Sequence, residues 1–535
     1  MNGWGIFLSM LTRSDKGAFP TAIATALRHL ICILALMWVG LANSQPLFFS
    51  TDSTNYIRTA DIAAYLASGK TFSTVWTDKY RSQLEPAVAV PDLEPQQLAE
   101  RERVRVHSVN DLKSGMIMGG RSPYIGALMY AGYITGDFWP FVLLQAAIAY
   151  GLIILALKRF QLATSRNVTL VTLALAATTA LPAYNSMLLA DAFTGFGILA
   201  FLLVVTDGGK FSRREFAFLC IVLVIFAVAH LTHIMILIGM LSVLTLMVVS
   251  RSVGPVPRRA WIAGIGGILI GFASIQATAL VTKAVFGQRP QLLPLLTARF
   301  IADGPGWRYI QSGCDGKRFQ MCRIHIGEPR SDALILFGAT KETGAYMLAD
   351  AKQRRKMGEE DVAFAMSVLR FDLTEQLSAI ARNTLKQFFW ITYDGLNQNC
   401  FAEQNCWISV PPSIREELRN TPSGRGLWPE HYMTVLLQAT IICSILTLLL
   451  LRLPLSSKAP AEWRMMRAWL IIAVTGMIIN SFFGGAIADP QYRYQTRLSW
   501  LIPLFGGIGL LLYLKLTLRG NLSGSNFSRS GATDG

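Results

Sequence analysis

Long apolar segments separated by basic loops constrain the fold of this chain more than any other feature. Of its 535 residues, 52% are hydrophobic and 15% are charged, which is too apolar for a soluble protein of this length. A membrane-spanning helix needs about 20 mainly apolar residues. Candidate spans lie near residues 23–42, 139–157, 168–183, 188–206, 216–230, 234–249, 260–281, 433–451, 468–483 and 498–516. We therefore predict an all-α polytopic membrane protein with about ten transmembrane helices.

The Lys and Arg residues between these segments predict the orientation, because cytoplasmic loops carry an excess of both. With about ten spans, the basic loops all fall on one side. The residues concerned are Arg13, Lys16, Arg28, Lys158, Arg159, Lys210, Arg213, Arg214, Arg251, Arg258, Arg259, Arg452, Lys458, Arg464, Arg467, Lys515 and Arg519. Both termini are then cytoplasmic, and two long loops face the periplasm of a bacterial inner membrane. These residues account for much of the net charge of +16, so that charge does not indicate a nucleic-acid partner.

The predicted organisation alternates membrane segments with extramembrane segments. It comprises a cytoplasmic N-terminus with the first span (1–42), a first outer loop with juxtamembrane helices (43–138), membrane helices two to seven (139–281), a large outer loop (282–432), membrane helices eight to ten (433–519) and a disordered cytoplasmic tail (520–535). Apolar spacing predicts an interfacial helix over 56–66. The apolar stretch 125–134 is too short to span the membrane, so we predict a second juxtamembrane or re-entrant helix there. Apolar spacing also predicts that the second long loop is mainly helical.

The cysteines fall into two groups. Cys32, Cys220 and Cys443 lie within apolar spans and are interpreted as small apolar side chains. The loop 282–432 holds Cys314, Cys322, Cys400 and Cys406. Four cysteines in an outer loop suggest two disulfides in an oxidising compartment. We favour the local pairs, Cys314 with Cys322 and Cys400 with Cys406. A zinc site is the alternative, although the spacing lacks the tight Cys-x-x-Cys pattern.

Two aspartates are the first candidates for chemistry. Asp52 follows the first apolar span, and Asp191 lies in the next outer connection, before the fourth span. Polar groups near hydrocarbon are costly and tend to be kept for function. The alternative for Asp52 is a cap on a helix that starts near Tyr56. For Asp191 the alternative is a helix N-terminus, where the helix dipole favours a carboxylate.

Basic and imidazole side chains occupy further outer connections. Arg493 and Arg497 are four residues apart and would share one helical face. Arginine forks suit phosphate oxygens, so we predict phosphate or diphosphate binding, with lipid headgroup anchoring as the alternative. His230 and His233 could orient a metal or carry a proton. Polar helix-end residues facing water or headgroups are the favoured interpretation of these histidines.

A third group surrounds the Gly-Pro-Gly turn of the second long loop. Arg299, Asp303 and Arg308 could bind substrate or pair with one another, and the sequence does not separate these interpretations. The chain contains no Walker loop, no HExxH motif and no dinucleotide glycine fingerprint. These absences argue against an ATP-driven pump and against a nucleotide-sugar enzyme with a soluble catalytic domain.

The layout of roughly the first 250 residues resembles the GT-C superfamily of polytopic glycosyltransferases. In that superfamily an acidic residue follows the first helix, juxtamembrane helices come next, and a Pro-containing apolar stretch precedes the second helix. A second Asp commonly lies before the fourth helix. Asp52, residues 56–66, Arg121-Ser122-Pro123-Tyr124 and Asp191 occupy these places in order. Many members carry an acidic pair in the first loop, whereas here Ser53 follows Asp52.

The resemblance implies transfer of a sugar from a polyprenyl-phosphate donor to a glycan, lipid or protein acceptor on the outer side. Asp52 would act as base on the acceptor hydroxyl or hold it, and Asp191 would assist. Arg493 and Arg497 would hold the donor phosphate as it leaves. Such a reaction needs a carboxylate near the nucleophile and positive charge at the leaving phosphate. Tyr56, Arg121 and Tyr124 become candidate substrate-binding residues, and a divalent cation, Mg²⁺ or Mn²⁺, is an open cofactor with no visible ligand set.

Two other classes remain open. A transporter or flippase for lipid-linked saccharides would tend to place charges near the membrane midplane, often in repeated halves. Here the charges gather at the outer edge, and no repeat is visible in the sequence. A polymerase or ligase of surface polysaccharide would share the donor lipid and the arginines but would not need Asp52.

Overall fold

The fold is described by a computed structural model. It describes residues 18–84, 121–207, 209–324, 331–338, 344–398, 409–451 and 460–527, together with positions 117, 119, 327 and 407. These residues form helices and no β-strand, and Leu47 and Met187 make an isolated parallel bridge. The predicted all-α class is therefore confirmed for this part of the chain.

Six helical segments in the described ranges are long and apolar enough to cross a membrane. They are α8 (Trp139–Arg159), α13 (Leu231–Val249), α14 (Arg258–Phe286), α23 (Glu430–Leu450), α24 (Ala461–Phe482) continued by the π-helical turn η2 (Phe483–Ile487), and α25 (Tyr492–Ser499) followed by α26 (Leu501–Phe527). Several apolar helices of this kind are typical of a membrane-embedded protein. Each of the six coincides with a predicted span.

The other four predicted spans fall on shorter elements, so ten spans are not confirmed. These elements are α2 (Ala18–Ala35), α3 (Trp38–Ala42), α9 (Ser165–Thr178), α10 (Leu181–Ser186), α11 (Ala192–Thr206) and α12 (Arg213–Ala229). The segment 168–183 is interrupted because α9 ends at Thr178 and a new helix begins with Pro182 in its first turn. Proline favours a helix start and has no N–H to continue the preceding one.

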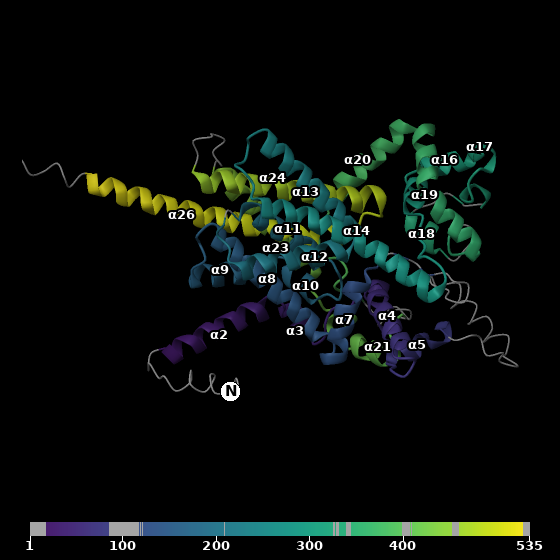
Figure 1. Cartoon of the computed structure of the whole chain (residues 1–535), viewed down its shortest axis with the longest axis horizontal. Coiled ribbons are helices and arrows are strands. Elements are labelled where there is room, and N and C mark those ends of the chain that lie inside the picture. Colours follow the sequence, from purple (N-terminus) through teal and green to yellow (C-terminus); the bar gives the residue numbers. More distant parts are fainter. Residues whose placement is uncertain are drawn as a thin grey trace, which may run out of the picture.

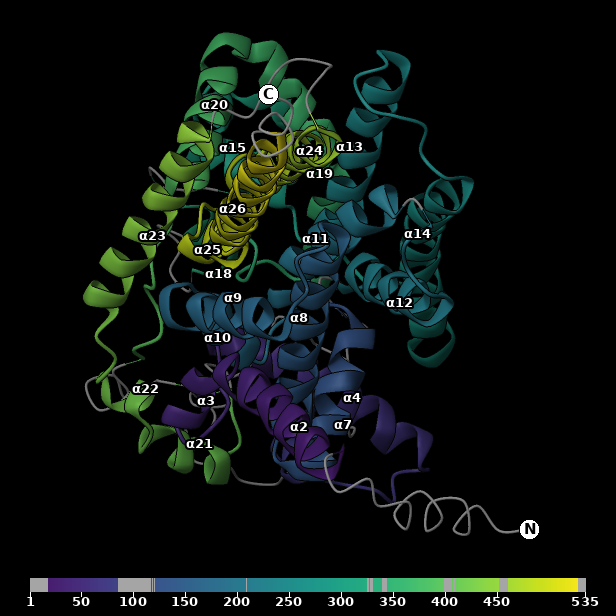
Figure 2. The ribbon, with the colours of Figure 1, turned by 90° about the vertical axis from the view of Figure 1, so that its left-hand side faces the viewer.

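The α11 helix is the centre of the bundle. All 14 residues from Ala192 to Val205 are buried, and the helix packs on α8, α12 and α24. A helix that is apolar on every side is stable only when other helices enclose it. In Figure 1 the helices α8, α11, α13, α24 and α26 run along the long axis of the molecule, and Figure 2 views the bundle end-on.

The first long loop folds onto one end of this bundle. It contains α4 (Ser50–Ala67), α5 (Val75–Leu84) and α7 (Pro123–Gly136), so helices are present where 56–66 and 125–134 were expected. The helix expected to start near Tyr56 begins earlier, at Ser50. α7 packs directly against α4. The contact is so close at Gly126 that a Cβ atom there would clash with the Tyr56 carbonyl oxygen.

The second long loop is also helical and lies at the same end of the bundle (Figure 1). Its elements are α15 (Leu295–Ala302), α16 (Pro305–Gln311), α17 (Cys314–Lys317), the 3-10 turn η1 (Met321–Arg323), α18 (Asp332–Phe337), α19 (Ala351–Phe371), α20 (Leu373–Phe389), α21 (Pro412–Arg419) and α22 (Pro422–Arg425). Residues from α15 to α19 share a separate apolar core. Cys314 and Cys322 form the predicted disulfide. Cys400 and Cys406 lie outside the described residues.

Candidate functional site

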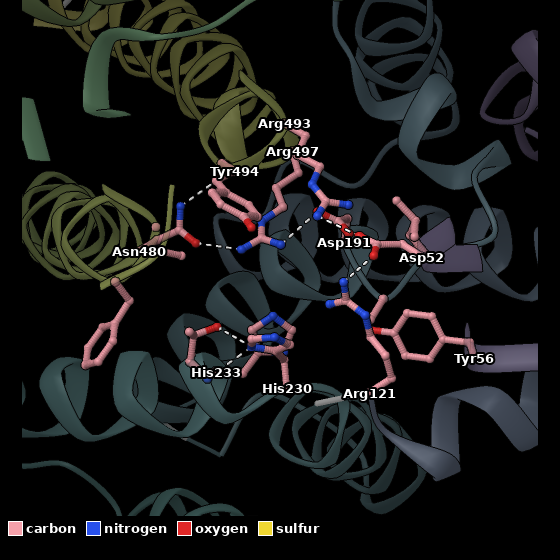
Figure 3. Close-up of a pocket in the computed structure, with 16 residues that line it drawn as sticks. Asp52, Tyr56, Arg121, Asp191, His230, His233, Asn480, Arg493, Tyr494 and Arg497 are labelled. Carbon is pink, nitrogen blue, oxygen red and sulfur yellow. Dashed lines mark hydrogen bonds and ion pairs between the residues drawn. The ribbon is translucent and has the colours of Figure 1, made fainter. Parts of the chain in front are cut away.

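Segments far apart in sequence surround a cavity at the loop-bearing end of the bundle (Figure 3). The lining residues are Asp52, Tyr56, Arg121, Leu189, Ala190, Asp191, His230, Thr232, His233, Asn480, Phe483, Gly484, Ala488, Arg493, Tyr494 and Arg497. Eight of the candidates selected from the sequence are among them, namely Asp52, Tyr56, Arg121, Asp191, His230, His233, Arg493 and Arg497.

Asp52 lies between two arginines. Its Oδ2 atom is 2.7 Å from Nη2 of Arg493, and its Oδ1 atom accepts a hydrogen bond from Nη2 of Arg121. Burial acts to raise the pKa of Asp52, but the charges of Arg121 and Arg493 outweigh it and lower the pKa to about 2. Asp52 is therefore ionised at neutral pH and is a weak base while both arginines hold it.

The capping alternative for Asp52 is wrong. Asp52 lies in the first turn of α4, and the residue at the N-cap is Phe49, which makes no side-chain capping bond. Asp191 does occupy the N-cap position of α11, but its side chain makes no capping hydrogen bond either. Both carboxylates instead face arginines across the cavity.

Arg497 connects Asp191 to Asn480. Its Nη1 atom donates to Oδ1 of Asp191 at 2.8 Å, and its Nη2 atom donates to Oδ1 of Asn480 at 2.8 Å. The amide of Asn480 in turn donates to the Tyr494 carbonyl oxygen at 2.7 Å. This chain of bonds fixes the orientation of the Arg497 guanidinium.

Arg493 and Arg497 share one face of α25, as their spacing predicted. Both side chains are 9% exposed, so they are buried within the protein rather than spread on a lipid-facing surface. The Arg493 guanidinium also stacks 4.5 Å from the centre of the Phe49 ring. The Nε–H groups of both arginines are buried and have no hydrogen-bond partner within the described structure.

The two histidines differ in their surroundings. Nε2 of His233 bonds Thr194 Oγ1 at 2.8 Å and Nδ1 bonds the Phe226 carbonyl oxygen at 2.9 Å, so both ring nitrogens are occupied within the bundle. Nδ1 of His230 accepts from the backbone N–H of Thr232 at 3.2 Å. The same Nδ1 atom lies 2.8 Å from Thr232 Oγ1, so Thr232 occupies this ring nitrogen. His230 is therefore the histidine whose Nε2 atom has no partner among the described residues and is left for a molecule in the cavity.

The remaining candidates lie elsewhere. Tyr124 donates to the Ser274 carbonyl oxygen at 3.1 Å on the exposed side of α7. Arg299 binds Asp303 at 2.7 Å and Asp489 at 3.1 Å, and these residues do not line the cavity. Arg308 pairs with Asp372 and Glu375 instead of Asp303. Of the two interpretations of this group, pairing among charged residues is the one that the geometry bears out for Arg299 and Asp303.

Several lining residues escaped the sequence reasoning. Asn480, Phe483 and Gly484 come from the end of α24 and the turn η2, and Tyr494 comes from α25. A polar Asn within an apolar span was a usable signal, because such residues are costly in a membrane and tend to be functional. A π-helical turn is likewise common at functional sites. No sequence pattern predicted the π-helical turn η2.

A divalent cation does not fit the described residues. They contain no group of three or more His, Cys, Asp or Glu side chains that could hold a metal ion. Asp52 and Asp191 are instead occupied by guanidinium groups.

Comparisons with known proteins leave the site to be interpreted from its own geometry. No family model, curated protein or solved structure matches the chain.

Proposed function

We propose that this protein is an integral membrane glycosyltransferase that uses a polyprenyl-phosphate sugar as donor. The observation that carries the proposal is the convergence of Asp52 with Arg493, beside Arg121, Arg497 and Asp191, in one cavity. The lining holds three arginines and two aspartates, so its formal charge is +1. That positive charge suits a phosphodiester, which carries one negative charge. The proposal agrees with the GT-C resemblance of the first half of the chain.

In the proposed reaction the acceptor oxygen forms a bond to C1 of the sugar, and the bond from C1 to the phosphate oxygen breaks. Asp52 takes or holds the acceptor hydroxyl proton, and polyprenyl phosphate leaves with the bonding electrons. Arg493 and Arg497 stabilise the charge on the leaving phosphate. The Nε2 atom of His230 is a further hydrogen-bonding group for the bound molecule.

The ion pairs of Asp52 suggest an order of events. Arg121 and Arg493 hold the Asp52 carboxylate, which lowers its basicity. A donor phosphate competes for the same guanidinium groups. Its binding would release Asp52 and raise the pKa of that carboxyl toward its ordinary value. The base would then become active only when the donor is in place.

Native mass spectrometry of the detergent-purified protein tests the donor site. We expect a bound polyprenyl-phosphate sugar that is lost in Arg493→Ala and kept in Arg258→Ala. The control removes an exposed arginine at the first residue of α14, which does not line the cavity. Phospholipid alone, even after addition of polyprenyl-phosphate sugars, would contradict the proposal. Movement of the intact donor across a vesicle membrane without sugar transfer would indicate a flippase instead.

A further inference from the structure

The α20 helix is amphipathic in the reverse of the usual sense. Two of its three buried side chains are glutamines, whereas four of its large apolar side chains are exposed. In a water-soluble domain the apolar side would face the core. This reversal needs an explanation from what surrounds the helix.

The inward face of α20 is held by amide hydrogen bonds. Gln376 and Asn383 donate to the Asp303 carboxylate at 3.1 and 2.8 Å. Gln387 donates to the Gln491 carbonyl oxygen at 2.9 Å and accepts from the Gln491 N–H at 2.8 Å. The Gln387 bonds tie the helix to the segment that precedes Arg493. Their polar partners fix which side of α20 faces the protein.

The outward face carries an apolar stripe with a spacing of four residues. Leu373, Leu377, Leu385 and Phe389 are between 51% and 73% exposed. Ala381 completes the stripe and is also exposed. Each step of four residues advances by about 40° around a helix, so these side chains form a band that winds across the outward side of α20 from its first turn to its last.

A second, charged strip runs beside the apolar stripe. Arg382 and Lys386 are exposed on this flank, and the Lys386 ammonium lies 4.8 Å from the centre of the Trp390 ring. A helix with an apolar side, a cationic flank and an aromatic end is typical of the boundary between lipid headgroups and acyl chains. The helix is too polar on its inward side to cross a membrane alone.

The position of α20 agrees with such a boundary. α20 packs on α24 and η2, and Figure 1 shows it leaning against the loop-bearing end of the bundle. A Cβ atom at Gly485 of η2 would lie 2.5 Å from the Asn383 carbonyl oxygen, so the contact is close. α24 itself exposes the apolar side chains of Ile471, Val474 and Ile478.

We infer that α20 is embedded in one bilayer leaflet, with its apolar stripe against phospholipid acyl chains and Arg382 and Lys386 at the headgroups. The surface is then a lipid-binding surface continuous with that of α24. It holds the segment before Arg493 against the membrane. The inference does not depend on the proposed transferase activity.

Spin labelling of the full chain in phospholipid nanodiscs tests this inference. The free cysteines of the described ranges, Cys32, Cys220 and Cys443, are replaced by serine, and single cysteines are introduced at Leu377 and Leu385. Labels at Arg382 and Lys386 on the charged flank serve as matched controls. The parent without introduced cysteines gives the background signal. Because all four positions are exposed, the labels should leave the fold intact.

We expect labels at Leu377 and Leu385 to be accessible to oxygen and several-fold less accessible to a water-soluble nickel chelate than the controls. Free access of the nickel chelate to the stripe would place it in water and overturn the inference. Exclusion of both reagents would also overturn it, because a second copy or another protein would then cover the stripe. Labels at Leu373 and Phe389 repeat the test if either first variant misfolds.

Discussion

Arg497 donates a hydrogen bond to Asp191 at 2.8 Å although 306 residues separate them in the sequence. The same short helix carries Arg493 to Asp52. Two carboxylates of the first half of the chain are thus neutralised by two arginines next to the last membrane helix. Removing a partner from a buried pair leaves a charge without compensation, which costs about 3–5 kcal/mol. The site and the assembly of the bundle are therefore energetically linked.

Asp52→Asn should abolish sugar transfer and tighten anion binding at the same time. The amide is not a base, so we expect transfer to fall by about a hundredfold or more. The substitution also frees Arg121 and Arg493 from the carboxylate, so the dissociation constant for polyprenyl phosphate should decrease. Transfer assays and titration calorimetry in nanodiscs measure the two effects. Glu359→Gln removes an exposed charge elsewhere and should change neither quantity. Normal transfer by a well-folded Asp52→Asn variant would exclude a catalytic role.

Arg493→Ala should weaken binding of polyprenyl phosphate by about tenfold to a hundredfold, because the variant loses one or two charge-assisted hydrogen bonds to the phosphate. Asp52 keeps Arg121 as a partner in this variant, so the fold should survive. Arg258→Ala is the matched control. Unchanged affinity with a normal melting temperature would mean that Arg493 serves only to hold Asp52.

Gly126→Ala should destabilise the contact between α4 and α7. The added methyl group would clash with the Tyr56 carbonyl oxygen, and overpacking of this kind costs about 1–3 kcal/mol. A lower melting temperature and a loss of transfer are expected together, since Asp52 and Tyr56 share α4. Gly266→Ala places a methyl group in open space on α14 and should be tolerated. Equal stability of the two variants would show that α4 can shift without cost.

Asp332→Asn should change how stability depends on pH. Burial, together with the nearby Asp489 carboxylate, raises the pKa of Asp332 to about 6 in spite of Arg299. The native state therefore binds more protons than the unfolded state between pH 4 and 6, and stability falls as the pH rises through that window. In Asp332→Asn this fall should shrink, and the variant should gain melting temperature relative to wild type above pH 6. A parallel pH profile for both proteins would contradict the shifted pKa.

The sequence predicted the long membrane helices well, because the length and apolar content of a segment largely determine whether it forms one. Six predicted spans coincide with long apolar helices, because such segments have few alternatives in a membrane protein. The predicted segments 188–206 and 216–230 also fall on helices, α11 and α12, but these helices are too short to count among the long apolar ones. Helices this short are stabilised by burial against neighbours, as for the fully enclosed Phe193 and Phe201 of α11, and that burial depends on the tertiary fold.

The sequence predicted which charged residues belong to the site but not which of them form ion pairs with one another. Asp52, Asp191, Arg493 and Arg497 were identified from their positions at the ends of apolar segments, and the structure brings all four to one cavity. Their pairing depends on how the last membrane helices pack against the first loop, which a single sequence does not reveal. The sequence left the role of Arg299 open for the same reason, because nothing local distinguishes a cavity-lining arginine from one that binds neighbouring aspartates.

The burial of α11 has a consequence for how the protein is made. During synthesis α11 leaves the ribosome well before α24, one of the helices that later enclose it. The nascent chain must keep this helix among lipids or at the insertion machinery until nearly all of the protein has been translated. Mutations in the α24 region should therefore cause quality-control degradation of the new chain even when they spare every residue of the cavity. Low abundance in the membrane, rather than low turnover, would be the first sign of such a defect.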